Sequence, residues 1–371
     1  MGNDVEILTA AVLAMQKQVE NLILQNQELL RWKNEMNGIV NVLPQAFENI
    51  NGAIEINKDA INECARNIYI VEKYVEKGID NRDYEVYDPR RQTEMNSYFY
   101  PQILSVDAAI DQIVGNGKSL ARFGDGEFSL MEGKQRWDFQ AMDDRLRKRL
   151  IEVIESSSDQ LLIGIANNYG TLSQYDLAGA MAIRAYMTPE TRKMHRKYLK
   201  EDRIYYDAYI TRPYVMYADK ESDAPGKRFE RLKTIWKNRN VIIVEGAHTC
   251  FGAGNDFLAE TASIRRILAP ATSSFSRYDE LLAEAVRIAE KGDLCLLALG
   301  PCAGVMAYDL CMDGIQAIDV GHADLEYEWF LAGEGRRVPI SYKFSIEDGN
   351  GDKVEEYHEP LYEKQIVARF E

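Results

Sequence analysis

The hydrophobic positions of the first 43 residues recur every three and four residues, which is the period of a helix with one apolar face. Residues 5–43 fit a heptad repeat with few interruptions. Its first core position holds Val5, Val12, Val19, Asn26, Lys33 and Val40, and its second holds Leu8, Met15, Leu22, Leu29, Met36 and Leu43. This composition is typical of a parallel dimer, in which the polar Asn26 and Lys33 fix the register. The pattern therefore predicts an N-terminal α-helical coiled coil that joins two copies of the chain.

Pro44 interrupts this helix, but the same frame continues in Phe47, Ile54, Ile61, Ile68 and Val75. Because proline is tolerated in the first turn of a helix, we expect a second helix to start at Pro44. Two arrangements stay open: the second helix continues the coiled coil, or it packs back on its own protomer. Residues 1–76 are thus predicted to form a homo-oligomerisation arm through residues 5–75. The polar stretch 77–97, which has no apolar period, is predicted to be a linker.

From residue 98 to residue 371 the pattern changes to short apolar runs between turn residues. Five runs predict buried strands at residues 120–123, 161–165, 241–244, 293–299 and 316–320. The last two flank a helix predicted for residues 305–312. Such a βαβ unit favours an α/β domain with a largely parallel sheet and helices on both faces. In these sheets ligands bind beyond the carboxyl ends of the strands.

Composition narrows the possible partners. The chain has 371 residues and a formal net charge of −15, so nucleic acid and anionic membrane surfaces are poor general partners. No apolar run approaches the roughly 20 residues that a membrane span needs, and the N-terminus lacks the pattern of a signal peptide. Five cysteines without Cys-x-x-Cys spacing favour reduced thiols and hence a cytoplasmic protein.

Two carboxylates, Asp125 and Glu127, directly follow the first predicted strand of this domain. Each of them is preceded by a glycine, Gly124 and Gly126. Two neighbouring acids repel each other, so a divalent cation between them would explain their approach. Oxygen ligands of this kind suit Mg²⁺ or Mn²⁺. The alternative is an exposed turn before a helix whose first turn favours acids.

Two glycine-rich loops lie beyond other strands. Gly252 and Gly254 offer backbone amides to a phosphate, helped by a helix N-terminus if one starts near Asp256. Phe257 replaces the third glycine of the dinucleotide fingerprint, which makes this loop poor evidence for NAD. The turn at residues 300–304 is a second candidate, although a tight strand-to-helix turn needs small residues in any case.

His322 and Glu326 follow the last predicted strand. A histidine at a strand exit can ligate a metal or take a proton, and His322 is the first candidate for both roles. Glu326 is the second candidate base, or else part of a solvated helix face. The aromatic stretch 205–214, which includes Arg212 and Tyr214, is predicted to face the acceptor or the donor sugar. The alternative is that its tyrosines pack on helices.

Five motifs in order make the chain similar to the GT-D type glycosyltransferases over about residues 98–370. They are Arg-Phe-Gly-Asp-Gly-Glu at 122–127, Ile-Val-Glu-Gly at 243–246, Gly-x-Gly-Asn-Asp at 252–256, Ala-Leu-Gly-Pro at 298–301 and Asp-Val-Gly-His at 319–322. The resemblance implies a Rossmann-like core and transfer of a hexose from a nucleotide-diphosphate sugar, commonly a UDP-sugar, to a glycan or glycoprotein acceptor.

The resemblance also implies roles for residues. Mn²⁺ or Mg²⁺ would be held through Asp125 and Glu127, with His322 as a possible third ligand, and it would meet the charge of the leaving diphosphate. The acceptor hydroxyl of an inverting reaction would lose its proton to His322 or a nearby glutamate. The expected donor-binding residues are Arg122, Phe123, Gly124, Asn167, Glu245, Gly252, Gly254, Asn255, Gly300 and Pro301.

Two other functions compete with this one. A similar sheet could serve an NAD or S-adenosylmethionine enzyme that uses the Gly252 loop and needs no metal. Alternatively, the chain could be a coiled-coil scaffold whose globular domain binds a ligand without turnover.

Overall fold

The computed structural model describes residues 2–36, 51–58, 60–62, 64, 65, 68, 100–134, 140–345 and 354–370. The chain divides into two compact units. One contains residues 1–83 and 181–188, and the other contains residues 84–180 and 189–371. Each unit is described separately.

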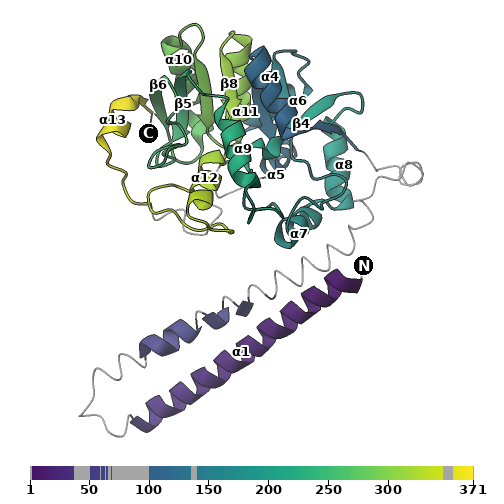
Figure 1. Ribbon diagram of the computed structural model, residues 1–371, viewed down its shortest axis with the longest axis vertical. Coiled ribbons are helices and arrows are strands. Elements are labelled where there is room, and N and C mark those ends of the chain that lie inside the picture. Colours follow the sequence, from purple (N-terminus) through teal and green to yellow (C-terminus); the bar gives the residue numbers. More distant parts are fainter. Residues whose placement is uncertain are drawn as a thin grey trace. The chain divides into compact units, whose positions relative to one another are not determined.

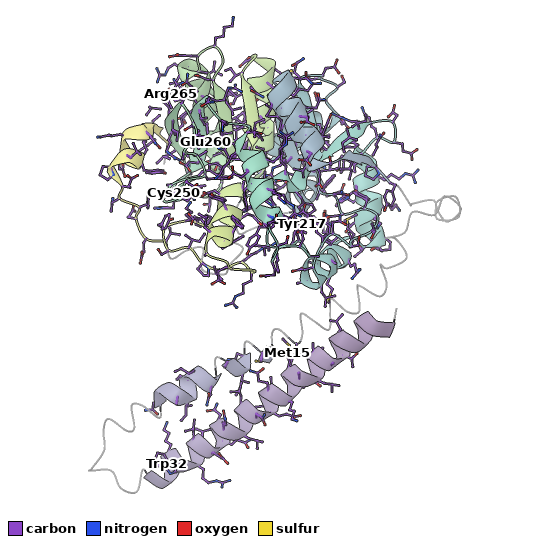
Figure 2. All side chains as sticks on the ribbon, in the orientation of Figure 1. Met15, Trp32, Tyr217, Cys250, Glu260 and Arg265 are labelled. Carbon is purple, nitrogen blue, oxygen red and sulfur yellow. The ribbon has the colours of Figure 1, made fainter. Side chains whose placement is uncertain are left out.

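The N-terminal unit contains one long helix, α1 (Gly2–Met36). From residue 8 to residue 33 only the predicted core positions of the heptad are half-buried, and every other side chain is exposed. Figure 2 marks one residue of each kind, the half-buried Met15 and Trp32, whose side chain is 53% exposed. The predicted helix is confirmed to Met36 and its core face from residue 8 to residue 33, while pairing between two chains stays a prediction.

The second predicted helix is described only in part. Residues 51–58 are helical. The predicted helix start at Pro44 and the predicted linker at 77–97 lie outside the described residues, as do residues 37–50. The choice between a continued coil and a helix that packs back therefore stays open.

The larger unit is built on a parallel sheet, whose described part has nine strands in the order β1-β4-β3-β2-β8-β7-β5-β6-β9 (Figure 1). Every pairing of neighbouring strands is parallel. The strands are β1 (Gln102–Leu104), β2 (Ser119–Phe123), β3 (Leu161–Ile165), β4 (Ile204–Asp207), β5 (Asn240–Gly246), β6 (Ser263–Ala269), β7 (Leu294–Ala298), β8 (Gln316–Asp319) and β9 (Ile366–Arg369). All five predicted strands are confirmed, and β1, β4, β6 and β9 were not predicted.

Helices cover the sheet. A helix that connects two parallel strands lies on a face that depends on the direction in which the chain moves across the sheet, because such connections are right-handed. From β1 to β2 the chain crosses the sheet in one direction, whereas from β2 to β3 and from β7 to β8 it moves in the other. Helix α4 therefore lies on the opposite face from α6 and α11, which contact each other. The helices that lie wholly in this unit are α4 (Val106–Asn116), α5 (Asp125–Met131), α6 (Asp144–Glu155), α8 (Pro189–Tyr198), α9 (Ala224–Lys233), α10 (Tyr278–Ile288), α11 (Pro301–Met312), α12 (Ala323–Leu331) and α13 (Pro360–Gln365), with 3₁₀ turns η3 (Ala208–Thr211) and η4 (Ser274–Arg277). Helix α7 (Leu177–Tyr186) is divided between the two units at residue 181.

The sheet has a topological switch point between β2 and β8. The chain leaves β2 toward β3 on one side, and it leaves β8 toward β9 on the other. Connections that part in this way leave a crevice at the carboxyl ends of the two strands, which is where such sheets bind ligands. No described helix is long and apolar enough to cross a membrane.

Candidate functional site

The two predicted metal ligands lie on the first turn of α5, which begins directly after β2. Residues two apart on a helix point to different sides, and here Asp125 is exposed while Glu127 is half-buried. Glu127 turns back on its own turn, where its Oε2 accepts a hydrogen bond of 2.7 Å from the amide of Gly124. Burial raises the pKa of Glu127, and the negative charge of Asp319 adds to that shift. Glu127 thus shapes the turn that carries Asp125, and joint binding of a metal ion by the two carboxylates stays a prediction.

Arg122 and Asp319 join β2 to β8 across the switch point. The guanidinium Nη2 donates to Asp319 Oδ1 at 2.6 Å, and Nε donates to the Asp319 carbonyl at 3.1 Å. Gly321 lies against this guanidinium in the left-handed region, with φ of 46°, and a Cβ there would stand 2.0 Å from Arg122 Nη2. Asp319 is 4% exposed, and burial raises its pKa although Arg122 opposes the shift. Asp319 thus holds Arg122, and only glycine fits at position 321.

His322, Arg212 and Glu326 form a second chain of contacts from the exit of β8. Arg212 Nη2 lies 3.1 Å from His322 Nδ1. Arg212 Nη1 lies 3.9 Å from Glu326 Oε1. Glu326 is 1% exposed, and its Oε2 accepts hydrogen bonds from the amides of Tyr214 and Val215 at 3.1 and 2.9 Å. Buried in this way, Glu326 is not on a solvated face and anchors the Arg212 segment.

Asp207 is a site residue that sequence reasoning missed. It ends β4, is 6% exposed, and accepts hydrogen bonds from the Tyr209 amide at 2.9 Å and from Asn167 Nδ2 at 3.5 Å. Among the described residues it makes no salt bridge, and burial raises its pKa to about 6. The charges of Asp207 and Asp125 both act on the Tyr209 phenol, whose pKa is raised mainly by burial. Asp207 thus stands at the carboxyl end of β4, two strands from β2 in the sheet.

The donor set fits a metal ion only in part. No group of three or more histidine, cysteine, aspartate or glutamate side chains is arranged to hold an ion within the described parts of the chain. Mg²⁺ in phosphate-handling sites, however, is commonly held by one or two carboxylates together with substrate phosphates and water. The exposed carboxylate of Asp125 fits such a shared site. A site built wholly from protein ligands does not fit.

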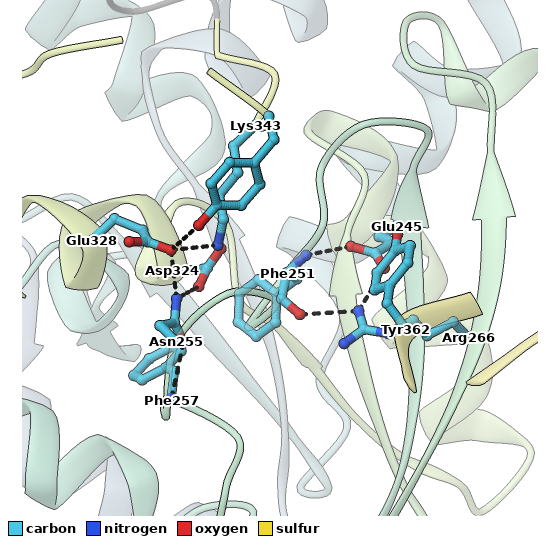
Figure 3. A network of polar contacts seen from close by, with 10 residues as sticks. Glu245, Phe251, Asn255, Phe257, Arg266, Asp324, Glu328, Lys343 and Tyr362 are labelled. Atoms are coloured by element: carbon cyan, nitrogen blue, oxygen red, sulfur yellow. Dashed lines mark hydrogen bonds and ion pairs between the residues drawn. The ribbon is translucent and has the colours of Figure 1, made fainter. Parts of the chain in front are cut away.

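On the other side of the switch point, Glu245 has a structural setting. It is fully buried, and its Oε1 accepts from Arg266 Nη1 at 2.6 Å and from the Tyr362 hydroxyl at 3.2 Å. Its Oε2 accepts from the amide of Phe251 at 2.6 Å. Figure 3 shows how this network joins β5, β6 and α13. The expected contact of this carboxylate with the donor is replaced by an ion pair inside the protein.

The Gly252 loop is held by a neighbouring network, also shown in Figure 3. Asn255 Nδ2 donates to Asp324 at 2.9 Å and to Glu328 at 2.8 Å, and its Oδ1 accepts from the amide of Phe257. Lys343 is 2% exposed and lies 2.5 Å from Asp324 and 2.9 Å from Glu328. The side chain of Asn255 thus has partners within the chain.

The geometry of the same loop also explains its glycines. A Cβ at Gly252 would meet Leu258 at 2.4 Å, and one at Gly254 would meet the Tyr342 hydroxyl at 2.3 Å. Residues 254–260 form bends and turns, so no helix starts near Asp256, contrary to expectation. The loop therefore lacks the helix N-terminus with which a dinucleotide fingerprint binds phosphate.

The remaining predicted residues divide between core and edge. Phe123 is fully buried, and Tyr214 is 4% exposed in the main core, edge-on to Phe330, so both side chains have packing roles. Gly300 has φ of 58° and precedes Pro301, the first residue of α11, at the carboxyl end of β7. They remain at the edge of the sheet where a ligand is expected.

Comparison with known proteins gives a consistent result. The family described as "Glycosyltransferase GT-D fold" matches residues 120–348. The glycosyltransferase GlyD of Streptococcus pneumoniae serotype 4 (strain ATCC BAA-334 / TIGR4) is 36% identical over 269 residues, which are 72% of this chain and 32% of that protein. The probable glycosyl transferase Gly of Streptococcus gordonii is 34% identical over 72% of this chain and 38% of its own length. This chain thus spans about a third of the length of these curated relatives.

Solved structures give the same match. A selenomethionine-substituted structure of the domain of unknown function 1792 is 32% identical, with a TM-score of 0.69, and the match covers 75% of this chain and 99% of that one. A structure described as a new glycosyltransferase from Streptococcus sanguinis is 30% identical, with a TM-score of 0.69, over 73% of this chain and 100% of that one. Both solved structures are thus matched over nearly their whole length by about three quarters of this chain.

Proposed function

The chain belongs to the glycosyltransferase family with the GT-D fold, and from this premise we propose that it transfers a hexose from a nucleotide-diphosphate sugar, preferably a UDP-sugar, to a glycan or glycoprotein acceptor. The observation that carries the proposal is the group of Arg122, Asp319 and Asp125 at the β2–β8 switch point, where an arginine and a carboxylate frame the expected ligand crevice.

The diphosphate of the donor would lie beside Arg122. A leaving diphosphate gains negative charge as the sugar–oxygen bond breaks, and donors fixed in advance stabilise that charge. Arg122 is fixed by Asp319, and Gly321 leaves room for its guanidinium. We place the uridine side of the donor at the exits of β7 and β5, near Gly300 and Pro301.

Asp125 is the residue we propose to hold Mn²⁺ or Mg²⁺ together with diphosphate oxygens. When bound, the ion would neutralise charge on the leaving group. Glu127 supports this arrangement indirectly, because its bond to the Gly124 amide fixes the turn that presents Asp125. The exposure of Asp125 beside a half-buried Glu127 supports this division of roles.

The acceptor side would lie at the exits of β3 and β4, around Asn167, Asp207 and Tyr209. In an inverting reaction the acceptor hydroxyl must lose a proton, and a base works best when its pKa lies near the working pH. Asp207, with a pKa of about 6, meets that condition. The carboxylate of Glu326 instead anchors the Tyr214 and Val215 amides. We therefore propose that Asp207 is the base that takes the proton of the acceptor hydroxyl.

A thermal-shift screen with UDP, GDP, NAD and S-adenosylmethionine, each with and without Mn²⁺, tests the proposed function. We expect UDP to raise the melting temperature of the protein only when Mn²⁺ is present. In a separate activity assay, we expect the protein to transfer the sugar from a UDP-hexose. Stabilisation by NAD or S-adenosylmethionine without metal would favour a cofactor enzyme. No shift with any of them would favour a scaffold.

Asp125→Asn tests the metal assignment. Transfer should fall by about a thousandfold, or about 4 kcal/mol, because a charged ligand is lost while the shape is kept. Steady-state rates across a Mn²⁺ titration measure this. Asp144→Asn is the matched control, since Asp144 is also an exposed first residue of a helix. Unchanged turnover in Asp125→Asn would remove this residue from the mechanism.

We also propose that the arm forms a parallel homodimer in the cytoplasm. The heptad repeat of residues 5–43, with Asn26 at a core position, supports the dimer. The cytoplasmic assignment is supported by five free thiols, four of them buried. Asn26→Val should change the oligomer number measured by light scattering, because a polar core residue specifies strand number. An unchanged dimer would show that other positions specify it.

A further inference from the structure

The contact between Arg212 and His322 determines where the imidazole carries its proton. A guanidinium has five N–H donors and no acceptor, and it stays charged in proteins. At 3.1 Å from Arg212 Nη2, the Nδ1 atom of His322 must therefore accept. A ring whose Nδ1 accepts is neutral and has its proton on Nε2.

The rest of the site keeps this contact in place. Behind Arg212 stands Glu326, a buried carboxylate fixed by two backbone amides, which attracts the guanidinium from 3.9 Å. His322 is held at the start of α12, one residue after Gly321. Gly321 packs on the guanidinium of Arg122, the second arginine of the site. The next residue in the chain, His322, therefore has its backbone close to that arginine.

Several N–H donors meet on this side of the switch point. Arg122 contributes a guanidinium from β2, Arg212 contributes another from the segment after η3, and His322 contributes its Nε2–H from the exit of β8. Each guanidinium is held by a carboxylate, Arg122 by Asp319 and Arg212 by Glu326, and guanidinium groups fixed in this way suit an anion.

We propose that His322 donates an Nε2–H hydrogen bond to the leaving diphosphate of the sugar donor, and that Arg212 is the positioning residue that sets this tautomer. This inference rests on the proposed glycosyl transfer for the identity of the anion. It replaces the expectation that His322 takes the acceptor proton or ligates the metal, since a protonated Nε2 can do neither.

The electron and proton balance is simple. The bond between the anomeric carbon and the diphosphate oxygen breaks, and its electron pair stays on the diphosphate. A bond from the acceptor oxygen to the anomeric carbon forms, and the acceptor proton leaves to Asp207. His322 keeps its proton throughout, and its hydrogen bond strengthens as the diphosphate gains charge.

Nitrogen NMR of the free protein tests the tautomer without any substrate. The chain has four histidines, so ¹⁵N-histidine labelling gives few signals, and His322→Gln assigns one of them. We expect His322 to be neutral with its proton on Nε2, and Arg212→Met to change that signal. A proton on Nδ1, or a doubly protonated ring, at neutral pH overturns the inference even where transfer activity is present.

Two substitutions test the role in turnover. The amide nitrogen of glutamine can take the place of Nε2–H, whereas that of asparagine reaches only the Nδ1 position. We expect His322→Gln to keep transfer within about tenfold of the native rate and His322→Asn to lose about a hundredfold or more, the usual effect of one lost donor. His358→Gln, at an exposed histidine, is the control and should change nothing.

The outcomes separate the two proposals. Equal and large losses in both His322 variants would show a base or a metal ligand and overturn the inference. Absence of transfer from every sugar nucleotide in the native protein would overturn the proposed function, whereas the tautomer of the free protein would still be measured independently.

Discussion

The two halves of the carboxyl edge of the sheet treat buried acids in different ways. Around β5 and β6, Glu245 is paired with Arg266, and in the adjoining network Asp324 is paired with Lys343, at 2.6 and 2.5 Å (Figure 3). Around β2 and β4, Glu127 and Asp207 make no salt bridge with any described residue, and burial raises the pKa of both. Paired acids stabilise a particular arrangement of loops, whereas unpaired buried acids are costly and are typical of functional sites.

The difference also locates the ligand. The polar groups of the Gly252 loop form hydrogen bonds with the acids of the paired networks. On that side of the edge, the acids therefore fix the backbone of the loop. On the other side, Asp207 makes no salt bridge with any described residue, whereas Arg122 is paired with Asp319. Asp207 therefore marks the side of the edge at which we place the acceptor.

Removing one member of a paired network should have the largest effect on stability. Arg266→Met leaves Glu245 as a buried charge without its cation, and the free energy of unfolding should fall by about 3–5 kcal/mol. Urea unfolding of the full chain measures it. Arg287→Met, at an exposed pair within one helix, should change it by no more than about 0.5 kcal/mol. A small effect of Arg266→Met would mean that the paired half is not structural.

Removing an unpaired acid should have the opposite sign. The pKa of Asp207 is raised in the folded protein, to about 6 from 3.8, so the folded state binds this proton more tightly than the unfolded state. Its favourable contribution is complete below pH 4 and is lost as the pH rises through 6. At pH 8 the ionised buried carboxylate costs about 3 kcal/mol.

Asp207→Asn should therefore raise the free energy of unfolding by about that amount at pH 8, and by little at pH 4. Unfolding curves across this pH range measure the change. Transfer activity should fall at the same time, because the base is gone. A variant that is both less stable at pH 8 and fully active would show that Asp207 only caps η3 through its bond to the Tyr209 amide.

A smaller effect is expected at the boundary between the halves. Gly321→Ala would place a Cβ 2.0 Å from Arg122 Nη2, so the guanidinium must move and the KM for the sugar donor should rise about tenfold, or about 1.4 kcal/mol. Gly333→Ala is the matched control: it has a similar φ of 68° but no atom within 4 Å of the added carbon. Both variants should lose about 1 kcal/mol of stability. Equal KM values in both would separate Arg122 from donor binding.

The fold could be predicted where the sequence carries a local pattern. Strands β3 and β7 are continuous apolar runs, and β2, β5 and β8 each contain a shorter apolar run. Such runs are the pattern of strands buried on both faces of a sheet. Strand β6 was missed because Arg265 and Arg266 interrupt its apolar run. Arg266 is 2% exposed only because Glu245 lies on the neighbouring strand, which no local pattern reveals.

The candidate site was predicted in the same uneven way. The positions of Arg122, Asp125 and His322 at strand exits follow from the order of strands and turns, and the structure brings these exits together. Asp207 was missed because β4 is only four residues long and its aromatic sequence lacks the apolar run of a buried strand. Its raised pKa depends on burial, which is a property of the packed molecule.

The sequence by itself determined the heptad face of α1, the parallel α/β architecture and the edge of the sheet at which polar residues collect, because each depends on periodicity or on short-range order along the chain. Only the tertiary structure decided what each polar residue does there. Glu245 and Asp207 are both acids at strand ends, but one meets Arg266 across the sheet and the other meets a tyrosine amide. Charge pairing joins residues far apart in the chain, and for that reason the division between structural and functional acids appears only after folding.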